Sequence, residues 1–182
     1  MQNTLEAIGA SFEIVPEAAG LRRGAKILLP GVGNFGQIMR ALDQLDVRAT
    51  LKERIAAGVP FLGICLGLQA LFERSAEAPD VDGLGIFEGS VERFPAGARV
   101  PHMGWNTVQS TKPSRLLERG REPYVYFANS YYVPVCAATA ATCTYTNPFT
   151  AVLESGNIFG VQFHPEKSGA AGLEIVQRFA AL

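Results

Sequence analysis

The 182-residue sequence is short of histidine and cysteine, with only two of the first and three of the second. Two histidines nearly exclude a multi-histidine metal site, and the cysteines form no C-x-x-C pair. We therefore expect no metal and no cofactor. An odd cysteine count also argues against a disulfide framework and favours a reducing compartment, the cytoplasm. Any chemistry that needs an imidazole must use His102 or His164.

Long apolar runs and charge of one sign are also absent. No apolar stretch approaches the ~20 residues that a membrane-spanning helix needs, and the first residues lack the basic and apolar regions of a signal peptide. Charged residues make up 18% of the chain and the net charge is −1, so neither nucleic acid nor a membrane is expected as a partner. The 48% hydrophobic content predicts one domain over residues 1–182.

Strands and helices are expected to alternate in the first half of the chain. The hydrophobic pattern predicts strands at 12–15, 26–29 and 61–64, and helices at 4–8, 35–45 and 47–57. Such alternation is typical of a mostly parallel central sheet that is covered on both faces. It predicts an α/β protein built as a three-layer sandwich.

The second half of the chain has a different pattern, with many short strands and little helix between them. Strands are expected at 86–94, 105–109, 124–133, 139–146, 150–153 and 158–163. A closing amphipathic helix is expected at 173–182. This half therefore predicts an antiparallel or mixed extension of the sheet.

Cys65 lies between an apolar strand and an amphipathic segment, with Gly63 and Gly67 two residues to either side. A sharp strand-to-helix turn exposes a nucleophile above the sheet, and flanking glycines permit the strained backbone and the close packing that it needs. A helix N-terminus would favour the thiolate, and the backbone N–H of Leu66 would face a developing oxyanion. The alternative is a buried structural cysteine, but the two glycines favour a nucleophile.

His164 follows another apolar strand, and Glu166 comes two residues later. The carboxyl end of a strand is where active sites of parallel sheets lie. Glu166 can accept a hydrogen bond from one ring nitrogen and leave the other nitrogen for a thiol. His-Pro-Glu alone fits an ordinary surface loop. Together with Cys65, which lies 99 residues earlier, it predicts a cysteine–histidine–glutamate triad.

Five segments of the chain carry a family resemblance. They are residues 29–33, 63–69, 101–106, 126–132 and 163–168. Together they resemble the glutaminase subunits of imidazole glycerol phosphate synthase, a family within the class I glutamine amidotransferases. The cysteine and His-Pro-Glu motifs are shared by the whole superfamily, whereas segment 101–106 and the Lys167-Ser168 pair after the glutamate are typical of this family.

The resemblance implies that the chain hydrolyses L-glutamine through a thioester at Cys65, with His164 as the proton shuttle and Glu166 orienting it. The loop after residue 30 would supply a second oxyanion donor from the backbone of Val32 or Gly33. A further set of positions matches those that hold the amino acid end of the substrate: Gln69, Ser130 and Tyr131. For Gln69 and Tyr131, ordinary helix and strand positions are the alternatives.

The resemblance also implies a partner, a (β/α)₈-barrel cyclase subunit that uses the ammonia to make imidazole glycerol phosphate and AICAR in histidine biosynthesis. The two proteins would form a heterodimer. Residues that would face the partner are His102, Trp105, Asn106 and Lys167. A half-buried core ring is an equal alternative for Trp105, and a solvated loop lysine is one for Lys167. His102 is a rival general base, but no carboxylate lies near it in the sequence.

Two departures from the family pattern affect these expectations. The family opens with an apolar strand and a loop before the first helix, whereas this chain begins inside that helix, at residues 2–6. The resemblance therefore implies that the first strand is absent and that the sheet is less stable. Asn129 stands where the family usually has histidine, and we expect it to tune the site.

Three other functions compete with this interpretation. The chain could be another class I amidotransferase component, as in anthranilate or guanylate synthesis, but segment 101–106 argues against that. It could be a non-catalytic binding subunit, which the intact triad disfavours. It could be a cysteine peptidase of similar topology, which Gln69 disfavours. A substrate assay separates the three.

Overall fold

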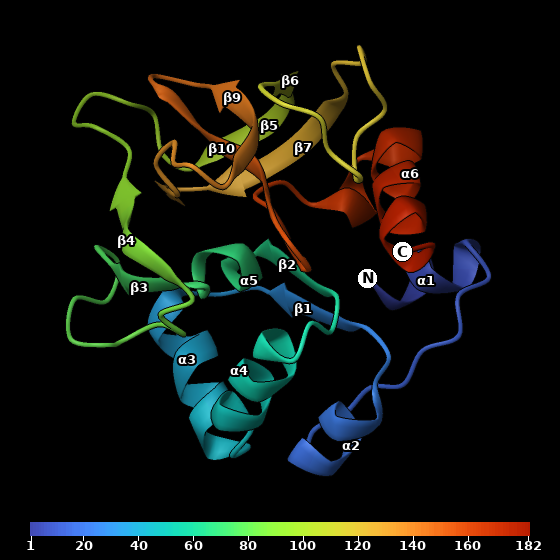
Figure 1. The fold of residues 1–182 in the computed structure, drawn as a ribbon. Helices are drawn as coiled ribbons and strands as arrows, with labels where there is room; N and C mark the ends of the chain where they lie inside the picture. The colour runs from blue at the N-terminus through green and yellow to red at the C-terminus, as the bar shows by residue number, and fades with distance from the viewer.

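The computed structural model describes residues 1–182 and is built around a six-stranded mixed sheet (Figure 1). The strand order is β1 (Ile27–Gly31), β2 (Phe61–Cys65), β11 (Ile158–Val161), β10 (Pro148–Ser155), β9 (Thr139–Thr144) and β6 (Gln109–Ser110). β1 and β11 flank β2 in parallel, and the other pairings are antiparallel. The α/β class and the antiparallel extension are confirmed, while the parallel part of this sheet is limited to three strands.

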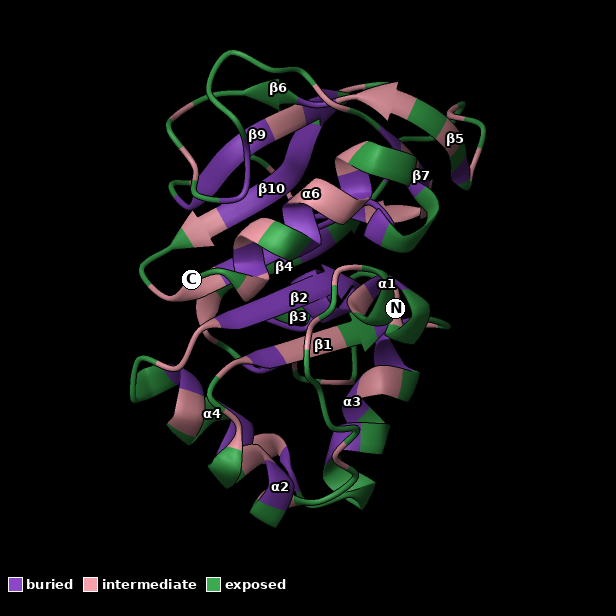
Figure 2. Cartoon of the chain, turned by 90° about the vertical axis from the view of Figure 1, so that its right-hand side faces the viewer, coloured by how far each residue is buried: buried purple, intermediate pink, exposed green.

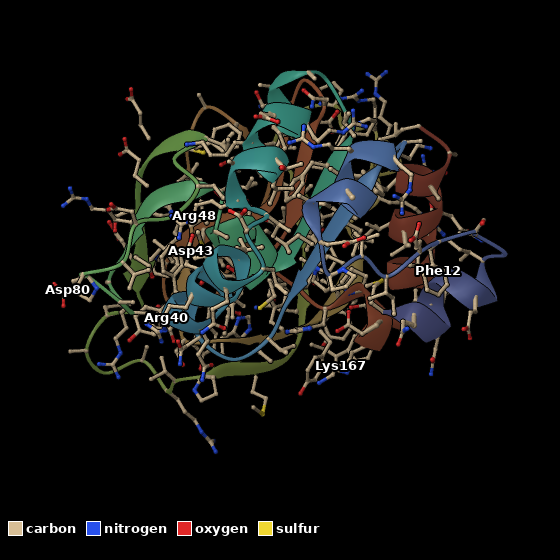
Figure 3. All side chains as sticks on the ribbon, turned by 90° about the horizontal axis from the view of Figure 1, so that it is seen from below. Phe12, Arg40, Asp43, Arg48, Asp80 and Lys167 are labelled. Carbon is tan, nitrogen blue, oxygen red and sulfur yellow. The ribbon has the colours of Figure 1, made fainter.

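The two faces of the sheet pack against different layers. The helices are α1 (Gln2–Ala7), α2 (Ala18–Arg23), α3 (Phe35–Gln44), α4 (Arg48–Ala56), α5 (Leu66–Gln69) and α6 (Gly169–Ala180). Along β2, Phe61 belongs to the core formed with α3 and α4, whereas Leu62 and Ile64 belong to the core that includes α6. An ion pair of 2.7 Å between Asp43 and Arg48 joins the end of α3 to the start of α4 (Figure 3).

Two smaller sheets complete the structure. β5 (His102–Thr107) pairs with β7 (Tyr124–Asn129) as an antiparallel ribbon. The second contains β3 (Phe72–Ser75), β4 (Phe87–Arg93) and β8 (Tyr131–Tyr132). Buried residues of β7 join the same core as α6, so the ribbon covers that face of the sheet beside α6 (Figure 1).

One expected strand does not form. Residues 12–15 run as an irregular loop, in which Phe12 and Ile14 are 38% and 65% exposed (Figure 3). β2 is buried along its length, whereas β1 is partly exposed and has no strand on its other side (Figure 2). Residues 12–15 do not pair with the free edge of β1 and belong to no sheet.

The structure has no helix that combines the length and the apolar character needed to cross a bilayer.

Candidate active site

Cys65 ends β2, and its backbone has φ +54° and ψ −107°. Residues other than glycine rarely adopt a positive φ, and such strain is concentrated at functional sites. The flanking glycines are needed because the turn is tightly packed. A Cβ at Gly63 would collide with the carbonyl of Gly67, and a Cβ at Gly67 would collide with the carbonyl of Leu29. The expected strand-to-helix turn is therefore present, with the thiol at its apex.

The helix after Cys65 is shorter than the sequence pattern suggests. α5 spans only Leu66–Gln69, and the chain enters β3 at Phe72. A single turn carries little of a helix macrodipole, so the expected support of the thiolate by that dipole is small. Leu66 occupies the first helical position, where an N–H group has no acceptor within its own helix. Its role as an oxyanion donor stays a prediction.

His164 is placed by the pairing of β11 with β2. Val161 pairs with Ile64, so the residues that follow β11 lie beside Cys65. The backbone N–H of His164 donates to the Tyr126 carbonyl at 2.9 Å, and the Ser168 hydroxyl donates to the His164 carbonyl at 2.6 Å. Its Nδ1 atom is 2.9 Å from Glu166 Oε1. The backbone of His164 and one nitrogen of its ring are thus held in place.

The electrostatics of the site favour a charged imidazole. Burial alone lowers the pKa of His164, but hydrogen bonds and charges from Cys65 and Glu166 outweigh it and raise the pKa to about 9. Burial also opposes ionisation of Glu166, yet the hydrogen bond from His164 brings the pKa of that carboxyl below its usual value. At neutral pH the site therefore holds an imidazolium next to a carboxylate. No group of three or more His, Cys, Asp or Glu side chains is arranged to hold a metal ion.

The loop expected to supply the second oxyanion donor lies next to the nucleophile. Gly31 pairs with Cys65 across β1 and β2, so Val32 and Gly33 follow directly beside the thiol. Val32 is 81% exposed, and Gly33 has φ +95°, which glycine adopts without strain. Asn34 then begins α3 with a capping box. The backbone of this loop is therefore accessible at the edge of the site.

The residues expected to hold the substrate's amino acid end lie close together. Ser130 and Tyr131 are half-buried at the junction of β7 and β8. Gln69 is only 2% exposed, and its Nε2 donates to the Tyr131 carbonyl and to Gln162 Oε1, both at 3.0 Å. The amide nitrogen of Gln69 is thus already used within the protein. Gln162 was not among the site residues predicted from the sequence. The signal that could have identified it is a polar residue at the end of an otherwise apolar strand.

One of the four expected partner-facing residues is not at the surface. His102 is 4% exposed and its ring stacks between Phe127 and Tyr145, at centroid distances of 4.9 and 4.2 Å. The prediction of a direct partner contact is therefore wrong for His102, because strand alternation turns it inward. Trp105 is 46% exposed, Asn106 is half-buried and Lys167 is exposed (Figure 3). The outward direction of Trp105 argues against its alternative as a core ring.

Comparison with known proteins defines the class. Residues 2–181 match the sequence model of the class-I glutamine amidotransferase family. A crystal structure of a glutamine amidotransferase superposes with a TM-score of 0.77 at 18% identity, over 100% of this chain and 92% of that one. The glutaminase domain of Trypanosoma brucei CTPS gives 0.66 at 14% identity, over 99% and 85%. The chain thus has the sequence and the fold of a class I glutamine amidotransferase.

More similar sequences narrow this to one family. The imidazole glycerol phosphate synthase subunit HisH of Methanothermobacter thermautotrophicus is 44% identical over 99% of this chain and 90% of the relative. The HisH subunit of Trichodesmium erythraeum is 45% identical over 97% of this chain and 86% of the relative. The chain belongs to the HisH family.

Proposed function

We propose that the chain is the glutaminase subunit of imidazole glycerol phosphate synthase and that it hydrolyses L-glutamine to glutamate and ammonia. The observation that carries the proposal is Cys65 on a strained strand-to-helix turn, next to a His164 that Glu166 holds at 2.9 Å. A nucleophile, a base and a group that orients the base are the parts that acyl transfer needs. Membership of the HisH family supports the same function.

The reaction follows from these positions. The Cys65 thiolate attacks the side-chain amide carbon of glutamine, and backbone N–H groups of Leu66 and of the Val32–Gly33 loop stabilise the oxyanion. The His164 imidazolium gives its proton to the departing ammonia, leaving a glutamyl thioester. His164 then takes a proton from water, which attacks the thioester and releases glutamate. Glu166 stabilises the imidazolium in both steps.

The ammonia is proposed to pass to a (β/α)₈-barrel cyclase subunit bound as a heterodimer. A largely exposed group on the ribbon of β5 and β7, here called the aromatic patch, consists of Met103, Trp105, Tyr124 and Tyr126. Trp105 stacks on Tyr124 with centroids 5.7 Å apart, and Lys167 Nζ lies 5.6 Å from the Tyr126 ring centroid. Clustered aromatic side chains next to a cation are typical of interaction surfaces.

The aromatic patch is directly connected to the triad. The Tyr126 carbonyl accepts the backbone N–H of His164, and the Tyr126 N–H donates to the Ser168 hydroxyl at 3.0 Å. Ser168 in turn donates to the His164 carbonyl. A partner that shifts β7 would therefore move the histidine, which supports coupling between partner binding and hydrolysis.

The experiment that tests the function is a glutamate-release assay with and without the cyclase subunit of a HisH relative's synthase. Hydrolysis is expected at Cys65 and is expected to increase when the cyclase subunit is present. Full turnover by the isolated chain, together with no micromolar binding of the cyclase subunit, would contradict the partner assignment. Absence of hydrolysis in both conditions would contradict the glutaminase assignment.

Replacing Trp105 by alanine is expected to weaken binding of the cyclase subunit about 10–100-fold, because a central aromatic anchor typically contributes about 2 kcal/mol or more. The dissociation constant is measured by calorimetry. Leu45→Ala is the matched control, since Leu45 has the same 46% exposure but follows α3, on the other face of the sheet. If the Trp105 variant and the control bind the cyclase subunit with equal affinity, the aromatic patch is not part of the interface.

A further inference from the structure

Gln162 is a fully buried polar residue with 0% exposure, directly after β11 and two residues before His164. Its backbone N–H donates to the Ala151 carbonyl at 3.0 Å, so the position of the chain is fixed. Its side-chain Nε2 lies 3.6 Å from Cys65 Sγ. The reaction described above gives this amide no role. A buried amide that is aimed at a sulfur calls for an explanation, because an apolar side chain would fill the same space at a lower desolvation cost.

The direction of this amide follows from a backbone carbonyl. The Tyr131 carbonyl can only accept, so the nitrogen of Gln69 must face it, at 3.0 Å. The second N–H of the same nitrogen then meets Gln162 Oε1, also at 3.0 Å. With its oxygen engaged by Gln69, Gln162 must present its own N–H to Cys65. The donor toward the sulfur is therefore determined by the network and does not depend on choosing between two amide orientations.

The Tyr131 carbonyl is itself held from two sides. Besides Gln69, the side-chain Nδ2 of Asn129 donates to it at 2.9 Å. The chain of contacts thus runs from Asn129 and Tyr131 through Gln69 and Gln162 to Cys65, and Asn129 Oδ1 is the one buried oxygen in it without a partner. Connected hydrogen bonds between buried side chains hold the two amides of Gln69 and Gln162 in one arrangement.

We propose that Gln162 is a positioning residue for the nucleophile: its amide N–H holds Cys65 Sγ and stabilises the thiolate charge, and Gln69 keeps that amide in the donating orientation. The proposal rests on the proposed function, in which Cys65 attacks as a thiolate. His164 and Gln162 then support the same sulfur. A hydrogen bond to a charged acceptor is stronger than one to a neutral group, so the contact favours the thiolate over the thiol.

The test measures the rate of Cys65 alkylation by iodoacetamide as a function of pH, in a Cys136→Ser background. In Gln162→Met, which fills the space without a donor, the midpoint pH of alkylation is expected to rise by about one unit, with about a tenfold lower rate at neutral pH. In Gln162→Glu, which keeps the shape but places a carboxylate at the sulfur, the rise is expected to be larger. In glutamine hydrolysis, kcat is expected to fall more than KM changes.

Gln177→Met is the matched control, because it makes the same chemical change at an exposed position of α6. It is expected to keep the original midpoint. A Gln162→Met or Gln162→Glu variant that melts at a lower temperature but keeps the original alkylation midpoint would show a purely structural role and overturn the proposal. Alkylation of Cys65 does not require glutamine hydrolysis, so it tests the role of Gln162 by itself. A failure of the proposed function shows separately, because the unsubstituted chain would then release no glutamate.

Discussion

Replacing Cys65 by alanine or serine is expected to reduce glutamine hydrolysis by at least about 10³-fold, because the thioester cannot form without the thiol. The glutamate-release assay in the presence of the cyclase subunit measures the loss. The fold is expected to persist, since the side chain is small and either replacement fits the same turn. Binding of the cyclase subunit is expected to be unchanged, which separates lost chemistry from lost structure.

The two other cysteines provide the controls. Cys136→Ser and Cys143→Ala are expected to retain most of the activity, because neither residue is in the triad. Burial raises the pKa of the Cys143 thiol to about 12, so that sulfur stays a neutral thiol at any working pH. Equal loss of activity in all three variants would mean that the cysteines act on structure and that Cys65 is not the nucleophile.

Acidification is expected to destabilise the protein between pH 6.5 and pH 4 through His102. Burial lowers the pKa of His102 to about 4. The unfolded chain therefore binds a proton near pH 6.5 while the folded chain does not, so stability present above pH 6.5 is lost as the pH falls. A pKa difference of about 2.5 between the unfolded and the folded chain corresponds to about 3 kcal/mol of unfolding free energy once the pH is below both values.

The structural cause of this shift is the surroundings of the ring. Asn106 Nδ2 donates to the Thr144 carbonyl at 3.1 Å and approaches His102 Nε2 at 3.4 Å. That nitrogen therefore faces a donor and must remain an acceptor, while Nδ1 is buried without a partner. A second proton on the ring would meet an N–H group on one side and aromatic faces on the others.

The measurement is urea unfolding at pH 6.5 and at pH 4.5 for the unsubstituted chain and for His102→Phe, which keeps an aromatic ring in the stack. The variant is expected to lose less stability over this range by about 2–3 kcal/mol. The pKa of His164 is raised, so its contribution to the unfolding free energy is lost as the pH rises from 6.5 through about 9. The two histidines therefore affect stability in separate pH ranges. If the unfolding free energy of the two proteins falls by the same amount between pH 6.5 and pH 4.5, His102 is not the cause of the loss.

The turn at Cys65 and the contact between His164 and Glu166 could be predicted from the sequence because their signals are local. Two glycines around Cys65 and the His-Pro-Glu spacing each describe one turn, and each turn is shaped by its own residues. The same holds for the helix at residues 35–45, whose pattern ends at the observed boundary to within one residue. These three predictions depend on neighbours in the chain more than on distant contacts.

Other features depend on distant partners, and the sequence patterns did not reveal them. Phe12 and Ile14 lie in an apolar segment that has the pattern of a strand but no strand beside it. His102 lies in a segment expected to face a partner, yet the alternation of β5 turns it into an aromatic stack. The N–H of Gln162 is directed at Cys65 only because the Tyr131 carbonyl determines the orientation of the Gln69 amide, and Gln69 in turn that of Gln162. Each of these depends on tertiary contacts between segments that are far apart in the chain.

The parallel pairing of β2 with β11 has a consequence for the order of events during synthesis. Cys65 is translated long before His164, and the pairing that brings them together spans nearly a hundred residues. Contacts of such long sequence separation form late, because the entropy of closing the loop must be overcome before the contact contributes. A nascent chain therefore carries an isolated thiol without its imidazole. Reactivity arises only when the last strand has docked, so hydrolysis of glutamine is confined to chains that have completed the fold.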